Sequence, residues 1–364
     1  MYRAKKSLLV LIFSIILFTF ASSFSKADNG LFAVIEKVLL PTEVDAQEAS
    51  LTSKDGILYM TWMEQDKTAT KVMFSMKTKT GWSEATSVHV GNDLFVNWAD
   101  FPRIAILSDK TIAVHWLQKI GKSGFDYQIK IALSADSGRT WSKPKILHED
   151  RSPVQHGFVS MIPNKEKLLS IIWLDGRTYG IKSEETKNIT EAMQLRATTI
   201  TSDGIIGDEV AIDLRTCSCC QTSITVTDKG TVIAAYRDRS EGEIRDISIA
   251  RLERNIWQEP FSLNYDGWEL SGCPVNGPAI SSIDKLVAVA WFTGAKGVSA
   301  VKVAFSDDDG QSFGTPFIIA NKDPIGRVDL EMLPDGDALV SWVEWIDGNE
   351  IINICRASQD HGCK

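Results

Sequence analysis

One short stretch, Ser134 to Trp141, recurs along this chain and constrains its fold more than any other feature. It reads S-A-D-S-G-R-T-W, and Ser306 to Phe313 repeats it as S-D-D-D-G-Q-S-F, each followed three residues later by a proline. In tight turns, Ser and Asp oxygens bond main-chain N–H groups, and glycine supplies the positive φ that a reversal needs. The stretch therefore predicts a turn between two strands, with an aromatic ring packed beneath it.

A second periodicity divides the chain into units. Weaker copies of the turn run from Ser75 to Trp82 and from Ala250 to Trp257, and a cut-off copy begins at Ser358. Upstream of the turns, apolar runs end in an aromatic residue, and these residues are Trp62, Trp116, Trp173, Tyr236, Trp291 and Trp342. By subtraction their spacings are 54, 57, 63, 55 and 51 residues. Six β-rich units of this length predict an all-β fold, a six-bladed β-propeller.

The first 27 residues have the features of a signal peptide. Three basic residues precede an apolar run over residues 8–20, and Ser25-Lys26-Ala27 offers small residues for cleavage. The run is short for a membrane span, and no cysteine follows it for a lipid anchor. We expect an exported protein, periplasmic or secreted, with no membrane anchor and with residues 28–364 forming the propeller.

Charge excludes one class of partner. The chain carries a net charge of −8, and its first 27 residues contain four basic residues and no acid, so the remainder stands at −8 − 4 = −12. An acidic surface repels phosphate backbones and anionic lipids. We expect no nucleic-acid partner.

The two ends of the chain suggest how the ring would close. Residues 31–44 read as one strand, and the last unit stops inside its turn. The N-terminal strand is therefore expected to complete the sixth blade and remove an open sheet edge. The alternative is that the sequence is a fragment of a longer chain.

Candidate ligand groups gather on the face opposite the repeated turns. Loops there begin two residues after each repeated aromatic, with Glu64, Gln118, Asp175, Asp238, Thr293 and Glu344. Arginines accompany the acids or lie in the crossovers between units, and guanidinium groups bind carboxylates and hydroxyls. The predicted ligand-binding residues are Arg177, Arg237, Arg239, Arg245, Arg327 and Glu344. The alternative is that these are solvated polar groups at strand ends.

Four cysteines fall in two crossovers of neighbouring units. R-T-C-S-C-C-Q-T holds Cys217, Cys219 and Cys220, and G-C-P-V-N-G-P holds Cys273. In an exported chain a disulfide from Cys273 to one of the triplet is expected. A soft metal, copper(I) or zinc, and a redox-active thiol pair are the two alternatives. Cys355 and Cys363, in the last unit, should lie far from this group.

The repeated S-x-D-x-G-x-x-W/F turn resembles the Asp-box (BNR) repeat of the sialidase superfamily. The R-T-C-S-C-C-Q-T, Y-R-D-R and G-C-P-V-N-G-P segments are similar to bacterial exported proteins described as sialidase-like or exo-α-sialidase. This resemblance covers nearly all of residues 28–364 and implies the propeller fold. For activity it implies an arginine triad, a Tyr–Glu nucleophile pair and an Asp acid/base.

The chain departs from that catalytic pattern. The first unit has no arginine, F-P-R-I at residues 101–104 is a scrambled form of the motif, and the last unit reads S-W-V-E-W without tyrosine. The resemblance leaves Arg237 and Arg327 for arginine roles, Asp100 for an acid, and Glu344 near the expected position. None of them lies in a matching motif.

The leading hypothesis is that the loop face binds a glycan or another anionic ligand, and hydrolyses it if two carboxylates flank the bond. Asp175 and Asp238 are the predicted catalytic pair. The alternatives are a metal or redox protein built on the four clustered cysteines, and a non-catalytic propeller that binds a partner protein.

Overall fold

The computed structural model describes residues 31–32, 36–42, 44–179 and 192–363. Two compact units divide the chain, Met1–Lys37 and Val38–Lys364, and every described strand belongs to the second. The predicted signal peptide, residues 1–27, lies outside the described residues. Among those residues no helix has the length and apolar character to cross a membrane.

The described strands form six antiparallel sheets of four or five strands each. The first three sheets consist of β1 (Ala46–Lys54), β2 (Ile57–Gln65), β3 (Thr70–Thr78), β4 (Gly81–Trp82) and β5 (Thr86–Gly91); β6 (Arg103–Ile106), β7 (Ile112–Lys119), β8 (Tyr127–Ser134) and β9 (Lys145–Ile146); and β10 (His156–Pro163), β11 (Leu169–Asp175), β12 (Met193–Ile200) and β13 (Val210–Thr216).

The other three sheets follow in the same chain order. They consist of β14 (Ser223–Val226), β15 (Val232–Arg237), β16 (Ile247–Glu253), β17 (Ile256–Trp257) and β18 (Phe261–Ser262); β19 (Ala279–Ile283), β20 (Leu286–Thr293), β21 (Ala300–Ser306) and β22 (Phe317–Ala320); and β23 (Pro324–Met332), β24 (Ala338–Ile346), β25 (Asn349–Ser358) and β26 (Gly362–Cys363). A 3₁₀ turn, Ala295–Gly297, is the one helical element in the described part of the chain.

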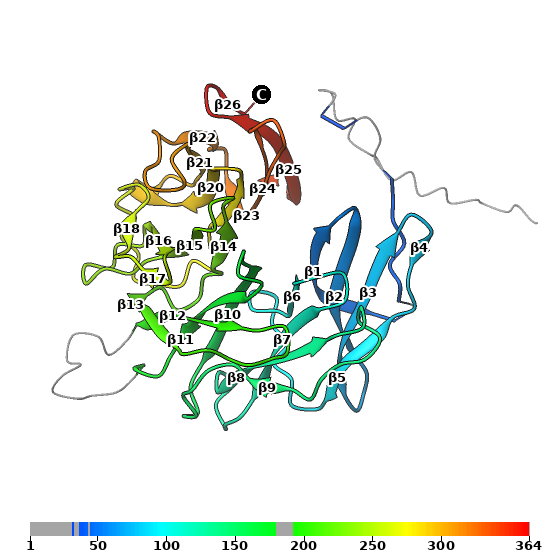
Figure 1. The fold of residues 1–364 in the computed structure, drawn as a ribbon. Coiled ribbons are helices and arrows are strands. Elements are labelled where there is room, and N and C mark those ends of the chain that lie inside the picture. The colour runs from blue at the N-terminus through cyan, green and yellow to red at the C-terminus, as the bar shows by residue number, and fades with distance from the viewer. Residues whose placement is uncertain (1–30, 33–35, 43, 180–191, 364) are drawn as a thin grey trace, which may run out of the picture. The chain divides into compact units, whose positions relative to one another are not determined.

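Within Val38–Lys364 the sheets pack in sequence order. The first strand of each sheet contacts the first strand of the next, from β1 and β6 to β19 and β23 (Figure 1). Five hydrophobic clusters lie between successive pairs of sheets, so the core is divided among the inter-sheet interfaces. This face-to-face packing of small sheets confirms the all-β fold and the six sheet-forming units that the repeat predicts.

The repeated aromatic residues anchor the second strand of each sheet. Five of the six are at most 1% exposed, and Trp342 is 7% exposed. In three sheets the indole Nε1 donates to the acid two residues later: Trp62 to Glu64 at 2.9 Å, Trp173 to Asp175 at 2.9 Å, and Trp342 to Glu344 at 3.4 Å. A buried N–H needs an acceptor, which gives these acids a structural role.

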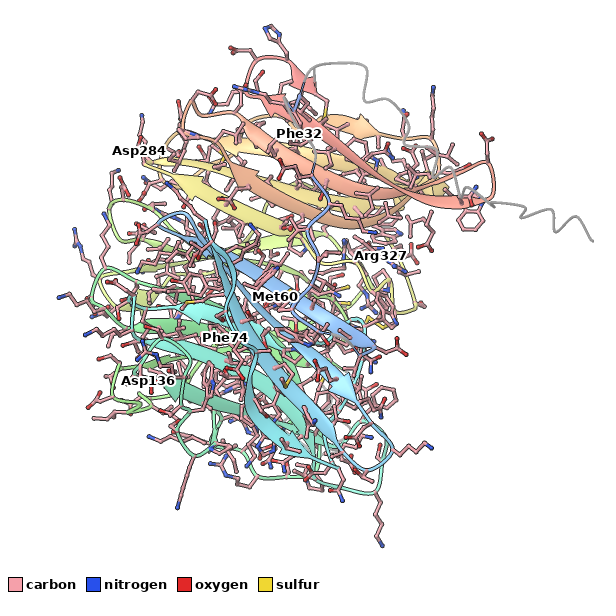
Figure 2. The ribbon with its side chains drawn as sticks, turned by 90° about the vertical axis from the view of Figure 1, so that its right-hand side faces the viewer. Phe32, Met60, Phe74, Asp136, Asp284 and Arg327 are labelled. Carbon is pink, nitrogen blue, oxygen red and sulfur yellow. A yellow bond between two sulfur atoms is a disulfide. The ribbon has the colours of Figure 1, made fainter. Side chains whose placement is uncertain are left out.

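The predicted turn is present at both strong copies and joins the third strand to the fourth. Ser134 Oγ donates to Asp136 Oδ1 at 2.8 Å and accepts from the Gly138 N–H at 2.8 Å. Gly138 has φ +83°, and a Cβ there would lie 2.1 Å from the Phe74 ring of the preceding sheet. The turn therefore also fixes the contact between two sheets (Figure 2).

The expected strand over residues 31–44 is not formed by the residues that the structure describes there. The fourth strand of the sixth sheet is β26 from the C-terminal end, paired with β25. A Cys355–Cys363 disulfide ties these two strands together. The prediction of an N-terminal closing strand is therefore wrong, because the chain supplies that strand from its own last turn.

Candidate functional site

A cavity of about 540 Å³ opens among loops that follow second strands and crossovers that link consecutive sheets. These are the segments predicted to carry the ligand face. Its lining residues come from the β5–β6, β9–β10, β13–β14 and β18–β19 crossovers, from the β7–β8 and β11–β12 connections, and from the starts of β8, β10 and β12. Residues far apart in sequence thus meet around one concave surface.

Aromatic side chains form much of the cavity wall. Phe95 stacks on Tyr127 with ring centroids 4.2 Å apart, and Phe125 lies 6.4 Å from Phe95. Trp98, Phe125 and Tyr179, which also line the cavity, are 51%, 62% and 53% exposed. Large exposed rings gathered at a concave surface are typical of a ligand site.

Asp100 is the most perturbed carboxyl of the cavity. It is 3% exposed, and burial raises the pKa of its carboxyl to about 7. The Phe158 N–H donates to Oδ1 at 2.8 Å, and the Tyr127 hydroxyl donates to Oδ2 at 3.1 Å. Gln155 Nε2 in turn donates to the Tyr127 hydroxyl at 2.6 Å. Asp100 therefore keeps its proton to a higher pH than an ordinary aspartate, and two donors hold its carboxyl in a fixed orientation.

Gly157 makes room for this carboxyl. A Cβ at Gly157 would lie 2.0 Å from Asp100 Oδ2 and 2.9 Å from the Tyr127 ring. The close approach of the β10 backbone explains why Asp100 can sit under the cavity floor. Gly157 is thus a part of the site although it has no side chain.

Asp126 is the second carboxylate of the cavity lining. Its Oδ2 accepts the Ser123 N–H at 2.9 Å, which orders the β7–β8 loop. No Lys, Arg or His lies among the described residues that line this cavity. The cavity therefore combines aromatic surface with two carboxyl groups and amides, and it offers no cation to an anionic ligand.

Asp175 and Arg177, predicted for catalysis and binding, form a partly buried ion pair. Arg177 Nε and Nη2 donate to the two oxygens of Asp175, both at 2.8 Å, and Arg177 Nη2 also lies 2.5 Å from Glu209. Burial raises the pKa of Asp175, but the Arg177 hydrogen bonds and His156 outweigh it and lower the value to about 2. Asp175 is fully buried and does not line the cavity.

Asp238, the other predicted catalytic residue, belongs to a separate carboxylate group. It accepts the Arg239 N–H at 2.6 Å and the Ser248 hydroxyl at 3.3 Å. Burial, and then the charge of Asp213, raise the pKa of Asp238 to about 6. Asp238 is not among the residues that line the 540 Å³ cavity.

Arg239 and Arg245 bind a glutamate that the sequence patterns did not indicate. Glu243 Oε1 accepts from Arg239 Nη2 at 2.9 Å, and Oε2 accepts from Arg245 Nη2 at 2.6 Å. The two guanidinium groups lower the pKa of Glu243 although burial opposes them. Glu243 therefore pairs with two arginines that were predicted from the sequence to bind a ligand.

Arg237 lies beneath the surface, 2% exposed. Its guanidinium donates to the main-chain carbonyls of Asn276 at 2.8 Å, Arg245 at 2.5 Å and Phe292 at 2.7 Å. It also lies 4.8 Å from the centre of the Trp268 ring. These contacts join the second strand of the fourth sheet to the β18–β19 crossover, the β15–β16 connection and β20, so the geometry gives Arg237 a structural role.

Neither Arg327 nor Glu344 is among the residues that line the cavity. Arg327, labelled in Figure 2, lines a second hollow of about 600 Å³. Its guanidinium stacks 4.7 Å from the centre of the Trp98 ring, which lines both hollows. Glu344 accepts from Trp342 and from Asn353 Nδ2 at 3.0 Å. The structure therefore distributes the predicted ligand-binding residues over several positions and brings few of them together.

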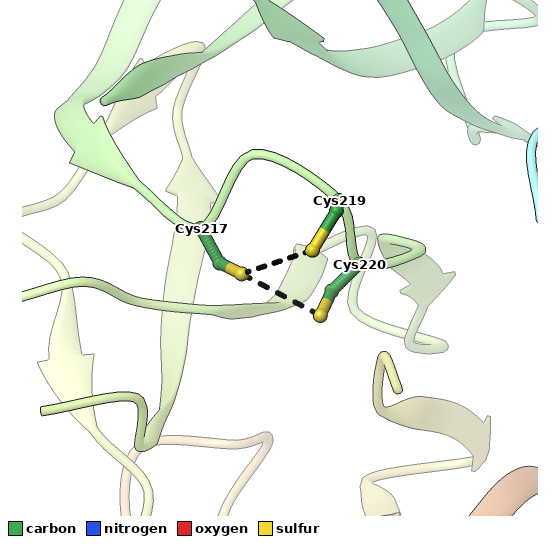
Figure 3. Close-up of side chains that lie close together, drawn as sticks. All are labelled: Cys217, Cys219 and Cys220. Carbon is green, nitrogen blue, oxygen red and sulfur yellow. Dashed lines mark hydrogen bonds between the residues drawn. The ribbon is translucent and has the colours of Figure 1, made fainter. Parts of the chain in front are cut away.

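The clustered cysteines confirm one prediction. Cys219 and Cys273 form a disulfide between the β13–β14 and β18–β19 crossovers, and both residues line the cavity. Cys217 and Cys220 are free and buried. The sulfurs of the triplet lie within 4.8 Å of one another (Figure 3), but a copper or zinc ion could use three of them as thiolates only after the Cys219–Cys273 bond is reduced.

Sequence reasoning weighed Asp100 only through the resemblance, and it missed Asp126, Tyr127 and Gln155. Their positions in the sequence could have indicated them, because each of these residues lies in or beside a segment on the predicted ligand face. The repeated pattern drew attention instead to acids two residues after each aromatic, and three of those acids are acceptors for the indole groups.

Comparisons with known proteins establish the fold. No protein-family model matches the chain, and no curated protein matches its sequence. A Hadza microbial sialidase has 14% identity and a TM-score of 0.51 over 86% of this chain, which spans 66% of that protein. A Dyadobacter fermentans protein of unknown function has 13% identity and a TM-score of 0.53, with 85% and 94% of the two chains covered.

A third solved structure is the Penicillium chrysogenum α-L-arabinanase complexed with arabinobiose. It has 14% identity and a TM-score of 0.52, with 87% of this chain and 94% of the arabinanase covered. Likeness at such low identity is likeness of fold. This chain has a sialidase-like propeller fold.

Proposed function

We propose that this protein is an exported six-bladed propeller that binds a neutral glycan in the 540 Å³ cavity and hydrolyses it with Asp100 as proton donor. The observation that carries the proposal is the buried Asp100 carboxyl, with a pKa raised to about 7, beneath an aromatic-lined cavity. A glycosidic oxygen leaves as an alcohol only after it gains a proton, and a carboxyl that is still protonated near neutral pH can supply one.

The second chemical requirement is another carboxylate. Glycoside hydrolysis uses a pair, one as acid and one as base or nucleophile. The cavity lining holds two carboxyl residues, Asp100 and Asp126. We assign the partner role to Asp126, since it is the other carboxylate of the lining and a hydrogen bond from the Ser123 N–H holds its Oδ2 in place.

The lining also suggests the class of glycan. Exposed Trp98, Phe125 and Tyr179 offer flat apolar surfaces for the C–H faces of sugar rings. The absence of cationic side chains among the described lining residues disfavours an acidic sugar, whose carboxylate would face two aspartates. Two similar structures, a sialidase and an arabinanase in complex with arabinobiose, support glycan chemistry on this fold.

Hydrolysis of nitrophenyl glycosides by the purified protein tests the proposal. The panel contains neutral pentosides and hexosides and one sialoside. We expect turnover of a neutral substrate, a loss of roughly 10²- to 10⁴-fold in kcat in Asp100→Asn, and unchanged glycan binding by calorimetry. Asp208→Asn, an exposed aspartate outside the cavity, is the matched control and should retain full activity.

Other outcomes would redirect or remove the proposal. Binding of neutral oligosaccharides without turnover would mean that the protein binds glycans, as a lectin does, and does not hydrolyse them. Loss of activity in Asp238→Asn with an active Asp100→Asn variant would move the catalytic centre to the predicted Asp175 and Asp238 pair. If the folded protein neither binds nor hydrolyses any of these glycans, the proposal is wrong.

A further inference from the structure

Two of the four clustered cysteines form a disulfide, and the other two carry free thiols. Cys219 and Cys273 form a disulfide that faces the cavity, with Cys219 partly buried and Cys273 exposed. Cys217 and Cys220 carry free thiols and are 0% and 2% exposed. Glycan binding and hydrolysis as proposed above make no use of either buried thiol.

The sulfur atoms are positioned for exchange. Cys217 Sγ lies 3.5 Å from Cys220 Sγ and 3.8 Å from Cys219 Sγ, one of the two sulfurs of the disulfide (Figure 3). Cys217 and Cys220 also have the C-x-x-C spacing that brings two thiols of one short loop together. Cys217 is thus in reach of both a partner thiol and a disulfide.

The surroundings shift the pKa values of the two buried thiols in opposite directions. The hydrogen bond between Cys217 and Cys220 and the charge of Arg245 outweigh burial and lower the pKa of Cys217 to about 6. Arg245 Nη1 donates directly to Cys217 Sγ at 3.2 Å. Burial raises the pKa of the Cys220 thiol. At neutral pH Cys217 is therefore the attacking thiolate, and Cys220 retains its proton until a later step.

We propose that these four cysteines form a thiol–disulfide relay, in which the buried Cys217 and Cys220 pair reduces small disulfides through the Cys219–Cys273 bond at the cavity. Cys217 thiolate attacks Cys219 Sγ, a Cys217–Cys219 bond forms, and Cys273 leaves as a thiolate that takes up a proton. Cys220 then loses its proton and attacks Cys217, and Cys219 leaves. Two electrons pass from the buried pair to Cys219 and Cys273.

The exposed pair completes the reaction with a substrate of the low-molecular-weight disulfide class. Cys273 thiolate attacks RS–SR and releases one RS⁻, which is protonated. Cys219 thiolate attacks Cys273 in the mixed disulfide and releases the second. The products are two RSH, a restored Cys219–Cys273 bond and a Cys217–Cys220 disulfide. The substrate is the oxidant, and each turnover of the relay uses one buried dithiol.

Burial explains why a relay is needed. Cys217 has no exposed surface, so an external disulfide cannot reach its sulfur directly. Cys273 is exposed and belongs to the cavity wall. The disulfide is therefore the connection between the cavity and the buried thiol pair.

Oxidised glutathione is the probe for the test. The folded protein is incubated with it, released thiol is measured, and the disulfides are mapped by peptide mass spectrometry after acid quench and alkylation. We expect two glutathione thiols released per chain and a new Cys217–Cys220 bond. In Cys220→Ser the map should show the arrested Cys217–Cys219 bond, which a purely structural disulfide would never produce.

Two variants separate the relay from direct attack and from misfolding. Cys219→Ser/Cys273→Ser should leave Cys217 and Cys220 as thiols under the same incubation, with a circular dichroism spectrum like that of the wild type. Cys355→Ser/Cys363→Ser removes the distant disulfide and should retain full thiol release. Arg245→Gln should shift the pH midpoint of exchange upward, because the thiolate of Cys217 loses its charged donor.

Three results would overturn the relay. The first is that Cys217 and Cys220 remain alkylatable in the folded wild type after incubation. The second is oxidation of that pair at the wild-type rate in the variant without Cys219 and Cys273. The third is a native mass that exceeds the chain mass by one soft metal ion bound to the two thiols. Glycoside hydrolysis is measured separately, so failure of the relay leaves the glycan proposal standing.

Discussion

The Tyr127 hydroxyl donates to Asp100 Oδ2 at 3.1 Å while it accepts from Gln155 Nε2 at 2.6 Å. These three residues come from three separate segments, the β5–β6 crossover, the start of β8 and the β9–β10 crossover. The chain of hydrogen bonds links the buried carboxyl to a side chain at the cavity surface. Asp100 is consequently both removed from bulk water and connected to the cavity.

The buried Asp100 makes stability depend on pH. Burial raises its pKa to about 7 in the folded protein, against about 3.9 in an unfolded chain, so the folded state holds this proton more tightly. This contribution to the free energy of unfolding is fully present below about pH 4 and is lost as the pH rises through about 7. We expect denaturant unfolding to show a larger fall in stability between pH 5 and pH 8 in the wild type than in Asp100→Asn.

The comparison with Asp100→Asn removes the effect of other groups. His115 and His148, whose pKa values burial lowers to about 3, titrate equally in both proteins. Parallel stability curves for the two proteins from pH 5 to pH 8 would show that Asp100 titrates as it does in an unfolded chain.

A methyl group at Gly157 should displace the Asp100 carboxyl. The Cβ of Gly157→Ala would meet Asp100 Oδ2 at 2.0 Å, which is inside van der Waals contact. We expect a loss of about 1–3 kcal/mol in the free energy of unfolding and a larger relative fall in kcat than in binding. Gly124→Ala is the control, since a Cβ there has no neighbour within 4 Å. Full activity in Gly157→Ala would exclude a catalytic role for the present position of Asp100.

The sequence was most informative where structure is local. The turn at Ser134 depends on oxygens, N–H groups and one glycine within a few residues, and the buried Trp173 follows from its apolar strand. Both could be predicted because neighbours in sequence supply the contacts. The Cys219–Cys273 bond was predictable in outline, since neighbouring units place the two crossovers side by side.

The site itself depended on contacts that no local pattern encodes. Arg237 looks like a ligand residue in sequence, but the main-chain carbonyls of Asn276 in the β18–β19 crossover and of Phe292 in β20 accept its N–H groups. Asp100 was named from the sequence only through the resemblance, and its raised pKa comes from burial, which no local pattern shows. Burial and charge at a site are tertiary properties, so their assignment required the structure.

Phe125 should contribute to glycan affinity and little to stability. It is 62% exposed at the cavity and lies in the β7–β8 loop, so its removal deletes ligand surface and leaves the sheets intact. We expect Phe125→Ala to weaken oligosaccharide binding by about 1 kcal/mol, roughly fivefold in Kd, with an unchanged Tm. Tyr265→Ala removes an 88% exposed ring outside the cavity and should bind as the wild type does. Equal weakening in both variants would place the glycan elsewhere.

A methyl group added at Gly138 should weaken the packing between the first and second sheets. Its φ of +83° disfavours any other residue, and a Cβ would also lie 2.1 Å from the Phe74 ring of the preceding sheet. Gly56 has a similar φ of +76°, and a Cβ added there would have no neighbour within 4 Å, so Gly56→Ala isolates the backbone strain, about 1–2 kcal/mol. Gly138→Ala adds the clash with Phe74 and should cost about 1–3 kcal/mol more by denaturant unfolding. Equal losses in the two variants would mean that Phe74 moves aside freely, and that this turn does not hold the first and second sheets together.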